Sequence, residues 1–145
     1  KMISQIKNGY DISILGFVAS NPKGYGRVVN FLSKKNNIKS YGVEYDGDVH
    51  KTAQKIKEKK VKLYCGDIFN FNLKKFNSKC FILVDPFKKI KDRYKFLSKV
   101  KKIYPSKKKY IIAINNYKGK FPQEFKMIYS LEASKTRSLK IYETF

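Results

Sequence analysis

One run of residues, Cys80–Phe87 (CFILVDPF), restricts the fold more than any other part of the sequence. The run is apolar almost throughout, so a strand formed by it needs cover on both of its faces. Strands of this kind lie at the centre of parallel sheets, where helices pack on both sides. We therefore predict a central parallel strand here and an α/β fold around it.

The rest of the chain alternates between strand-like and helix-like segments. Runs of β-branched and aromatic residues predict four further strands, at Asp11–Ala19, Lys39–Tyr45, Val61–Asp67 and Lys109–Tyr117. Apolar residues at helical spacing predict helices at Arg27–Asn36, Gly47–Lys60 and Asp92–Tyr104. The last two segments are joined by a short connection and predict an antiparallel hairpin of Phe125–Ala133 and Arg137–Phe145.

This order of elements predicts one domain that spans residues 1–145. A chain of 145 residues is long enough for one hydrophobic core and too short for two. We expect a three-layer α/β sandwich with a mostly parallel seven-stranded sheet and a C-terminal antiparallel hairpin. No run of about eighteen apolar residues occurs, so no membrane span is expected.

The composition is strongly basic, with a net charge of +22 from 33 basic and 11 acidic residues. Thirty of the basic residues are Lys, and the others are Arg27, Arg93 and Arg137. A field this positive favours a polyanionic partner such as RNA or DNA. A Lys-coated surface and an acidic protein partner remain open as alternatives, because Lys acts as a point charge and carries little base-reading information.

The two cysteines, Cys65 and Cys80, lie in apolar runs that resemble strand interiors. We expect both to be buried free thiols in a reducing compartment, which favours a cytoplasmic protein. They do not form a CxxC pair, so no metal site is predicted. His50 is expected to be an exposed helix residue and not a catalyst.

Polar residues follow the predicted parallel strands, at the ends where ligands bind in such sheets. In chain order they are the loop Ser20–Gly26 (SNPKGYG), Glu44, Asp67, Asp85–Phe87 and the pair Asn115–Asn116. Carboxylates or amides therefore close four consecutive strands in a chain with only 11 acids. This placement predicts that they share one site.

Each of these residues has a physical role at a nucleoside site. Gly24 and Gly26 allow the backbone to approach a ligand, and the helix that follows offers unpaired N–H groups. Glu44 comes eighteen residues after Gly26 and is placed to accept hydrogen bonds from ribose hydroxyls. Asp67 is placed to accept from an adenine amino group, and Asp85 to orient or deprotonate a target amine.

Plainer interpretations of the same residues remain open. Glu44 is also explained as a solvated acid at the end of a strand, and Asp67 as part of a Gly-Asp turn. Asp85 is also explained as a residue that shapes the turn before Pro86. The loop glycines are also explained by helix packing alone.

At these positions the chain resembles the class I S-adenosylmethionine-dependent methyltransferases. The resemblance covers Asp11 to Phe145 and is carried by KGYGR before a helix, GVEYD before a helix containing HKTAQKI, YCGDIF, ILVDPF and the closing hairpin. It implies a methyltransferase-like Rossmann domain with S-adenosylmethionine as cofactor. The cofactor-binding residues that it implies are Ser20, Asn21, Gly24, Gly26, Glu44, Asp67 and Ile68. The catalytic residues that it implies are Asp85, Pro86 and Phe87.

The sequence departs from the family pattern in its first loop. Ser20 stands where the family has an acid, and Pro22 stands where it has the first glycine. Two functions therefore remain open: a methyltransferase acting on a nucleic acid, with RNA favoured, and an inactive methyltransferase-like subunit that binds RNA or stimulates a partner enzyme. The terminal hairpin and the incomplete glycine fingerprint argue against a third function, that of a nicotinamide-dependent oxidoreductase.

Overall fold

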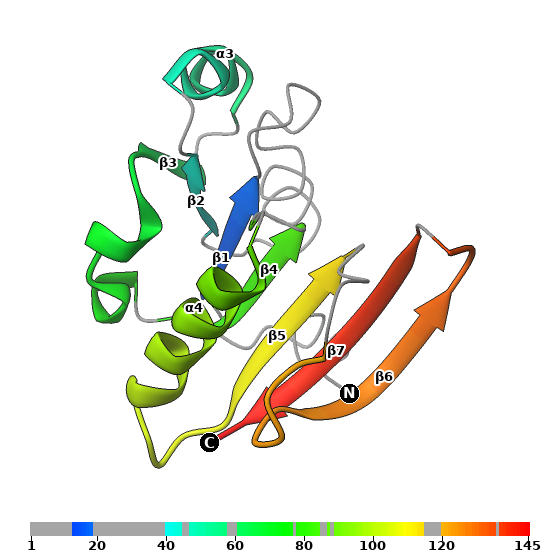
Figure 1. Ribbon diagram of the computed structural model, residues 1–145. Helices are drawn as coiled ribbons and strands as arrows, with labels where there is room; N and C mark the ends of the chain where they lie inside the picture. Colours follow the sequence, from blue (N-terminus) through cyan, green and yellow to red (C-terminus); the bar gives the residue numbers. More distant parts are fainter. Residues whose placement is uncertain are drawn as a thin grey trace.

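A computed structural model describes residues 13–18, 40–44, 47–57, 61–76, 78–84, 87, 89–114, 120–135 and 137–145. These residues confirm the α/β class (Figure 1). The strands are β1 (Ser13–Val18), β2 (Ser40–Glu44), β3 (Val61–Cys65), β4 (Ser78–Val84), β5 (Lys109–Ile114), β6 (Lys126–Glu132) and β7 (Ser138–Thr144). The helices are α3 (Gly47–Ile56), α4 (Ile90–Lys102) and the short 3-10 turns η1 (Ile68–Asn70) and η2 (Leu73–Phe76). The helix predicted at Arg27–Asn36 lies outside the described residues.

The described strands form one seven-stranded sheet in the order β3-β2-β1-β4-β5-β7-β6. Strands β1 to β5 pair in parallel, with Phe17 of β1 opposite Val43 on one side and Leu83 on the other. Strand β7 pairs antiparallel with β5 and β6, so the last two strands form a hairpin (Figure 1). The strand order reverses at β1 and β4, which is where ligands bind in open parallel sheets.

Strand β4 lies in the middle of the sheet and is buried on both faces. Phe81 and Leu83 are 0% exposed, and the alternate residues Cys80 and Ile82 are 1% and 2% exposed. Successive side chains of a strand point to opposite faces, so both faces of β4 are covered. This confirms the prediction of a central parallel strand drawn from the apolar run.

Helices α3 and α4 pack against opposite faces of the sheet. Phe96 of α4 belongs to the same buried cluster as Val43 of β2. Ala53 of α3 lines a small cavity together with Gly42 of β2. Val49 and Ala53 of α3 are buried but do not belong to the cluster of Phe96, so the two helices pack on opposite faces of the sheet. Each fully buried apolar side chain in these contacts contributes about 1.5–3 kcal/mol.

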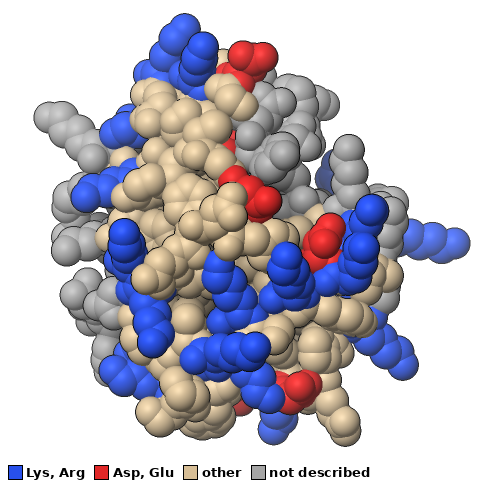
Figure 2. Space-filling view, turned by 60° about the vertical axis from the view of Figure 1, so that its left-hand side comes forward, with Lys and Arg blue, Asp and Glu red and all other residues tan. Residues whose placement is uncertain are grey.

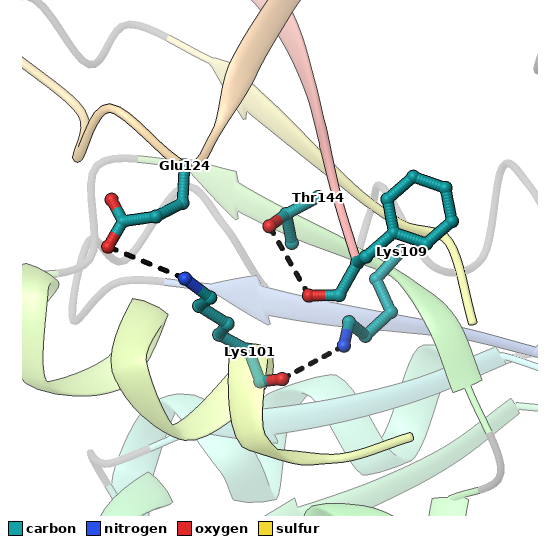
Figure 3. A network of polar contacts seen from close by, with 5 residues as sticks. Lys101, Lys109, Glu124 and Thr144 are labelled. Atoms are coloured by element: carbon teal, nitrogen blue, oxygen red, sulfur yellow. Dashed lines mark hydrogen bonds and ion pairs between the residues drawn. The ribbon is translucent and has the colours of Figure 1, made fainter. Parts of the chain in front are cut away.

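A buried lysine closes the C-terminal end of α4 (Figure 3). The residue Lys109 is 0% exposed. Its Nζ donates to the carbonyls of Lys101 (3.0 Å), Ile103 (2.7 Å) and Tyr104 (3.2 Å). The last carbonyls of a helix have no intrahelical donor, and this ammonium group supplies one. Burial lowers the pKa of Lys109, and the charge of Lys101 lowers it further.

Several details differ from the prediction. Cys65 is a free thiol as expected but is exposed, because it ends the edge strand β3. The strand predicted to run to Asp67 ends at Cys65, and η1 begins directly after Asp67. His50 is half-buried against the sheet instead of exposed. Neither η1 nor η2 was expected, since three or four residues are too few to show helical periodicity.

Candidate functional site

The carboxyl ends of β2 and β3 lie side by side and are joined through Gly66. The N–H of Gly66 donates to the carbonyl of Glu44 at 2.9 Å. Gly66 has a φ of 149°, which side-chain-bearing residues rarely adopt. A Cβ at this position would also lie 3.3 Å from the ring of Phe71. The glycine therefore allows the chain to leave β3 and bring Asp67 next to the end of β2.

Glu44 is a buried carboxylate, with only 6% of its surface exposed. It lines a cavity of about 10 Å³ beneath α3, together with Gly42, His50 and Leu63 among others. A space of this size has room for about one water molecule. A nucleoside bound by Glu44 would therefore lie beyond the strand end and not in this cavity. The burial argues against the interpretation of Glu44 as a solvated acid.

Asp67 is the N-cap of η1. Its Oδ1 accepts a hydrogen bond from the N–H of Phe69 at 3.0 Å. This bond forms the local turn that a Gly-Asp pair favours. The interpretation of Asp67 as a turn residue therefore describes part of its role. A carboxylate has two oxygens and about four acceptor positions, so capping leaves acceptor capacity for a ligand.

Lys99 of α4 holds the η1 segment in place. Its Nζ donates to the carbonyls of Phe69 (3.0 Å) and Phe71 (2.7 Å). Burial lowers the pKa of Lys99, and the nearby carboxylate of Asp67 opposes that shift. Lys99 thus fixes the backbone that follows Asp67. The sequence did not indicate this role, because one lysine among thirty carries no local signal.

Ile68 and Phe87 are largely packing residues. Ile68 is 8% exposed and belongs to the main hydrophobic cluster, so its backbone is the part available to a ligand. The ring of Phe87 is stacked with Phe69 at a centroid distance of 6.1 Å and lies 5.7 Å from Phe96. These contacts fix the ring of Phe87 beside η1, at the carboxyl side of β4.

The other predicted site residues lie outside the described residues. They are Ser20, Asn21, Gly24 and Gly26 of the first loop, Asp85 and Pro86 after β4, and the pair Asn115–Asn116 after β5. Of the predicted cofactor-binding set, the structure brings together Glu44, Asp67 and Ile68. Their assignment to a cofactor stays a prediction.

Arg93 is a second residue near the site that the sequence did not indicate. It lies in the first turns of α4, close to the end of β4, and is only 3% exposed. Its guanidinium carbon lies 4.9 Å from the ring centre of Phe121 and 5.8 Å from that of Tyr94. The available signal was its rarity, since Arg occurs three times in the chain and Lys thirty times.

Basic side chains predominate on the face shown in Figure 2. Exposed or half-exposed lysines of α4 contribute to the positive surface, at positions 91, 95, 101 and 102. Acidic partners are few: ion pairs among the described residues include Lys101–Glu124 at 3.5 Å and Lys140–Glu132 at 3.4 Å. Among the helices that the structure describes, none is long and apolar enough to cross a membrane.

Comparisons by sequence find no relatives: no protein-family model matches, and no curated protein matches. Comparisons by structure find methyltransferases. An RNA methyltransferase from Salinibacter ruber in complex with S-adenosyl-L-homocysteine has a TM-score of 0.64 and 14% identity, covering 99% of this chain and 86% of that one. A SAM-dependent methyltransferase from Aquifex aeolicus has a TM-score of 0.68 and 14% identity, with coverage of 99% and 88%.

A mutant of MtNAS has a TM-score of 0.68 and 11% identity. The match covers 99% of this chain and 57% of the MtNAS chain, so the chain spans just over half of that protein. MtNAS has also been crystallised with S-adenosylmethionine. At these identities the likeness concerns the fold. The seven-stranded sheet, its strand order and these neighbours together show that the chain has the fold of the class I S-adenosylmethionine-dependent methyltransferases.

Proposed function

We propose that the chain is an S-adenosylmethionine-dependent methyltransferase that acts on RNA. The observation that carries the proposal is the buried carboxylate of Glu44 at the carboxyl end of β2, within a sheet of the methyltransferase order. A carboxylate has about four acceptor positions, and hydroxyl groups of a ribose are suitable donors to one at the carboxyl end of a strand. The domain is proposed to extend over residues 1–145.

The residues around the ends of β2 and β3 fit the nucleoside part of the cofactor. Glu44 would accept from the two ribose hydroxyls, since its carboxylate is held by the surrounding packing. Asp67 would accept from the adenine amino group with the capacity that capping leaves. The backbone of Ile68 would lie against the adenine ring edge.

The chemistry requires alignment more than acid or base strength. Bound S-adenosylmethionine supplies a methyl group on a sulfonium, which is displaced in line by a nucleophile. Asp85 is proposed to orient the target amine and to accept its proton. Pro86 would stiffen the turn that carries Asp85. Phe87, fixed by Phe69 and Phe96, would support that turn from the hydrophobic core.

The proposed RNA substrate is supported by charge. A net charge of +22 attracts polyanions and accelerates their association. RNA methylation is also the activity named for the Salinibacter ruber neighbour. An exposed basic surface around α4 would provide contacts to the phosphate backbone (Figure 2).

An inactive subunit is the second candidate, and one observation favours it. Ser20 and Pro22 replace the acid and the first glycine that meet the amino-acid end of the cofactor in the family. Such a subunit would bind RNA, or stimulate a partner enzyme, without turnover. Retained RNA binding with no measurable cofactor binding would support this candidate over the enzyme.

Isothermal titration with S-adenosylmethionine and S-adenosylhomocysteine tests the proposal. Glu44→Ala should weaken cofactor binding by about 1–3 kcal/mol, because the ribose hydrogen bonds are lost. Asp67→Asn keeps one oxygen for the η1 cap and replaces the other oxygen, an acceptor for the adenine amino group, by an NH₂ donor. It should therefore weaken cofactor binding less than Glu44→Ala does. Glu132→Ala is the control, because Glu132 is an exposed acid of β6 that pairs with Lys140.

Tight cofactor binding that Glu44→Ala leaves unchanged would remove the ribose assignment. The substrate class is tested by incubating the protein with labelled cofactor and total RNA, DNA or protein extract. Label should enter the RNA fraction. Label in protein alone would contradict the proposed substrate and leave the cofactor assignment intact.

A further inference from the structure

Arg93 is buried without the hydrogen bonds that the other buried cations make. Its Nε and Nη2 are both inaccessible to solvent and have no hydrogen-bond partner. Lys109, equally buried, donates to three carbonyls, and Lys99 donates to two. Backbone carbonyls therefore accept from the ammonium groups of Lys109 and Lys99, whereas Nε and Nη2 of Arg93 have no acceptor.

The two atoms without partners form one edge of the guanidinium. Nε–H and the adjacent N–H of Nη2 point in nearly the same direction, which is the geometry that binds two oxygens of one oxyanion. An arginine is always charged, so its burial cannot be relieved by loss of a proton. Within the described part of the chain, no ion pair involves Arg93. An unpaired buried charge is costly, and an external anion would offset that cost.

The surroundings hold the guanidinium in one place. Its central carbon lies over the ring of Phe121, 4.9 Å from the ring centre, and that ring is stacked on Tyr142 at 4.0 Å with an interplanar angle of 2°. Burial raises the pKa of Tyr142, and the charge of Arg93 opposes that shift, which agrees with a cation close to this ring. A cation–π contact of this kind holds the guanidinium beside the ring without using its N–H groups.

Arg93 also lies at the side of the sheet where transfer is proposed. Helix α4 follows β4 directly, so its first turns stand near the carboxyl end of that strand, beside Phe87. The hydroxyl of Tyr94 donates to the carbonyl of Lys120, the residue before Phe121. Tyr94 is 39% exposed, so this contact lies at the surface, and its two residues are the chain neighbours of Arg93 and Phe121.

We propose that Arg93 binds a phosphate group of the substrate, through Nε and Nη2, next to the nucleotide that is modified. The inference rests on the proposed function for its substrate, an RNA strand, and adds the residue that positions it. Phosphate is the oxyanion that such a substrate presents, and Arg is the residue that matches two of its oxygens. Lysine contacts on the surface would add attraction without fixing the position of the strand.

The test compares four proteins: wild type, Arg93→Met, Arg93→Lys and the control Lys102→Met. Lys102 is an exposed lysine in the last turn of the same helix, so its substitution removes the same charge. Fluorescence anisotropy of a labelled single-stranded oligoribonucleotide gives the affinity of each at fixed salt. Thermal unfolding in inorganic phosphate, against chloride at equal ionic strength, reports anion binding without any RNA.

Arg93→Met and Arg93→Lys should each weaken oligoribonucleotide binding about tenfold, the effect expected for loss of a bidentate contact. Lys102→Met should weaken it less than about threefold, since exposed charges are screened. Phosphate should stabilise the wild type more than chloride does, and Arg93→Lys should abolish that difference. Arg93→Lys keeps the positive charge and the aliphatic part of the side chain, so it tests the phosphate contact even if Arg93→Met does not fold.

Wild-type affinity in Arg93→Lys would overturn the inference, because charge alone would then suffice. A loss in Arg93→Met no larger than in Lys102→Met would overturn it as well. Titration of S-adenosylhomocysteine into the same samples separates the two proposals. Cofactor binding without an Arg93 effect on RNA refutes this inference alone, and an Arg93 effect without cofactor binding refutes the methyltransferase alone.

Discussion

Substitution of Lys99 by Met tests whether the candidate adenine site depends on support from α4. Lys99 reaches from the helix to the carbonyls of Phe69 and Phe71, at 3.0 and 2.7 Å, and so spans the η1 turn that Asp67 caps. Methionine keeps the length of the side chain and removes the donors. The two carbonyls are then left to water, and η1 loses its attachment to the core.

The stability lost in Lys99→Met follows from the two hydrogen bonds and from the desolvation cost that opposes them. Hydrogen bonds from a charged donor contribute about 1.5–3 kcal/mol each, which gives roughly 3–6 kcal/mol before desolvation. Burial lowers the pKa of Lys99, so holding the ammonium group here has a desolvation cost that methionine avoids. We expect a net loss of about 1–3 kcal/mol, expressed mainly as local opening of η1.

Hydrogen exchange of the amides of Phe69 to Phe71 measures this opening, and titration calorimetry measures cofactor affinity. Exchange should accelerate in Lys99→Met, and affinity should fall about tenfold for each 1.4 kcal/mol lost. The matched control is Lys95→Met, one turn earlier, whose Nζ lies 4.4 Å from the ring centre of Phe69 and makes no carbonyl bond in the described structure. Equal exchange rates and affinities in the two variants would refute the reasoning.

Three further predictions concern stability and thiol chemistry. Lys109→Met should lower the free energy of unfolding by about 2–4 kcal/mol in urea titrations, because three carbonyls at the end of α4 lose their donor, whereas the exposed neighbour Lys108→Met should cost less than about 1 kcal/mol. Cys65 should react with a thiol reagent in the native protein and Cys80 only after unfolding. Burial raises the pKa of Cys80 from 9.0 to about 12, so the unfolded chain releases this proton first. Stability should therefore fall between pH 9 and pH 12, and Cys80→Ala should flatten that fall.

Strands β2, β4, β6 and β7 were predictable because each has a local sequence pattern. The apolar run before Asp85 required cover on both faces, and β4 has it. The terminal hairpin followed from two strand-like segments with a short connection, and β6 and β7 pair accordingly. The strand predicted at Lys39–Tyr45 corresponds to β2, which spans Ser40–Glu44. Each of these inferences depends on residues close together in the chain.

The features that were missed depend on residues far apart in the chain. Lys99 meets Phe69 across thirty positions, and Arg93 meets Phe121 across twenty-eight. Nothing in either local sequence distinguishes these side chains from solvated ones on a basic helix. The exposure of Cys65 was missed for a related reason, because only the strand order shows that β3 is an edge strand.

The positive charges of this protein fall into classes that respond differently to salt. Exposed lysines attract a polyanion through counterion release, so their contribution to RNA affinity falls steeply as salt rises. The ammonium groups of Lys99 and Lys109 donate to backbone carbonyls, so they would contribute little to RNA affinity or to its dependence on salt. Arg93 is buried, so its contact with a phosphate would be screened far less than a surface pair. The difference in affinity between wild type and Arg93→Lys should therefore persist at salt concentrations that remove the effect of Lys102→Met. A residue that positions the substrate and a surface that only attracts it are thus separable by ionic strength.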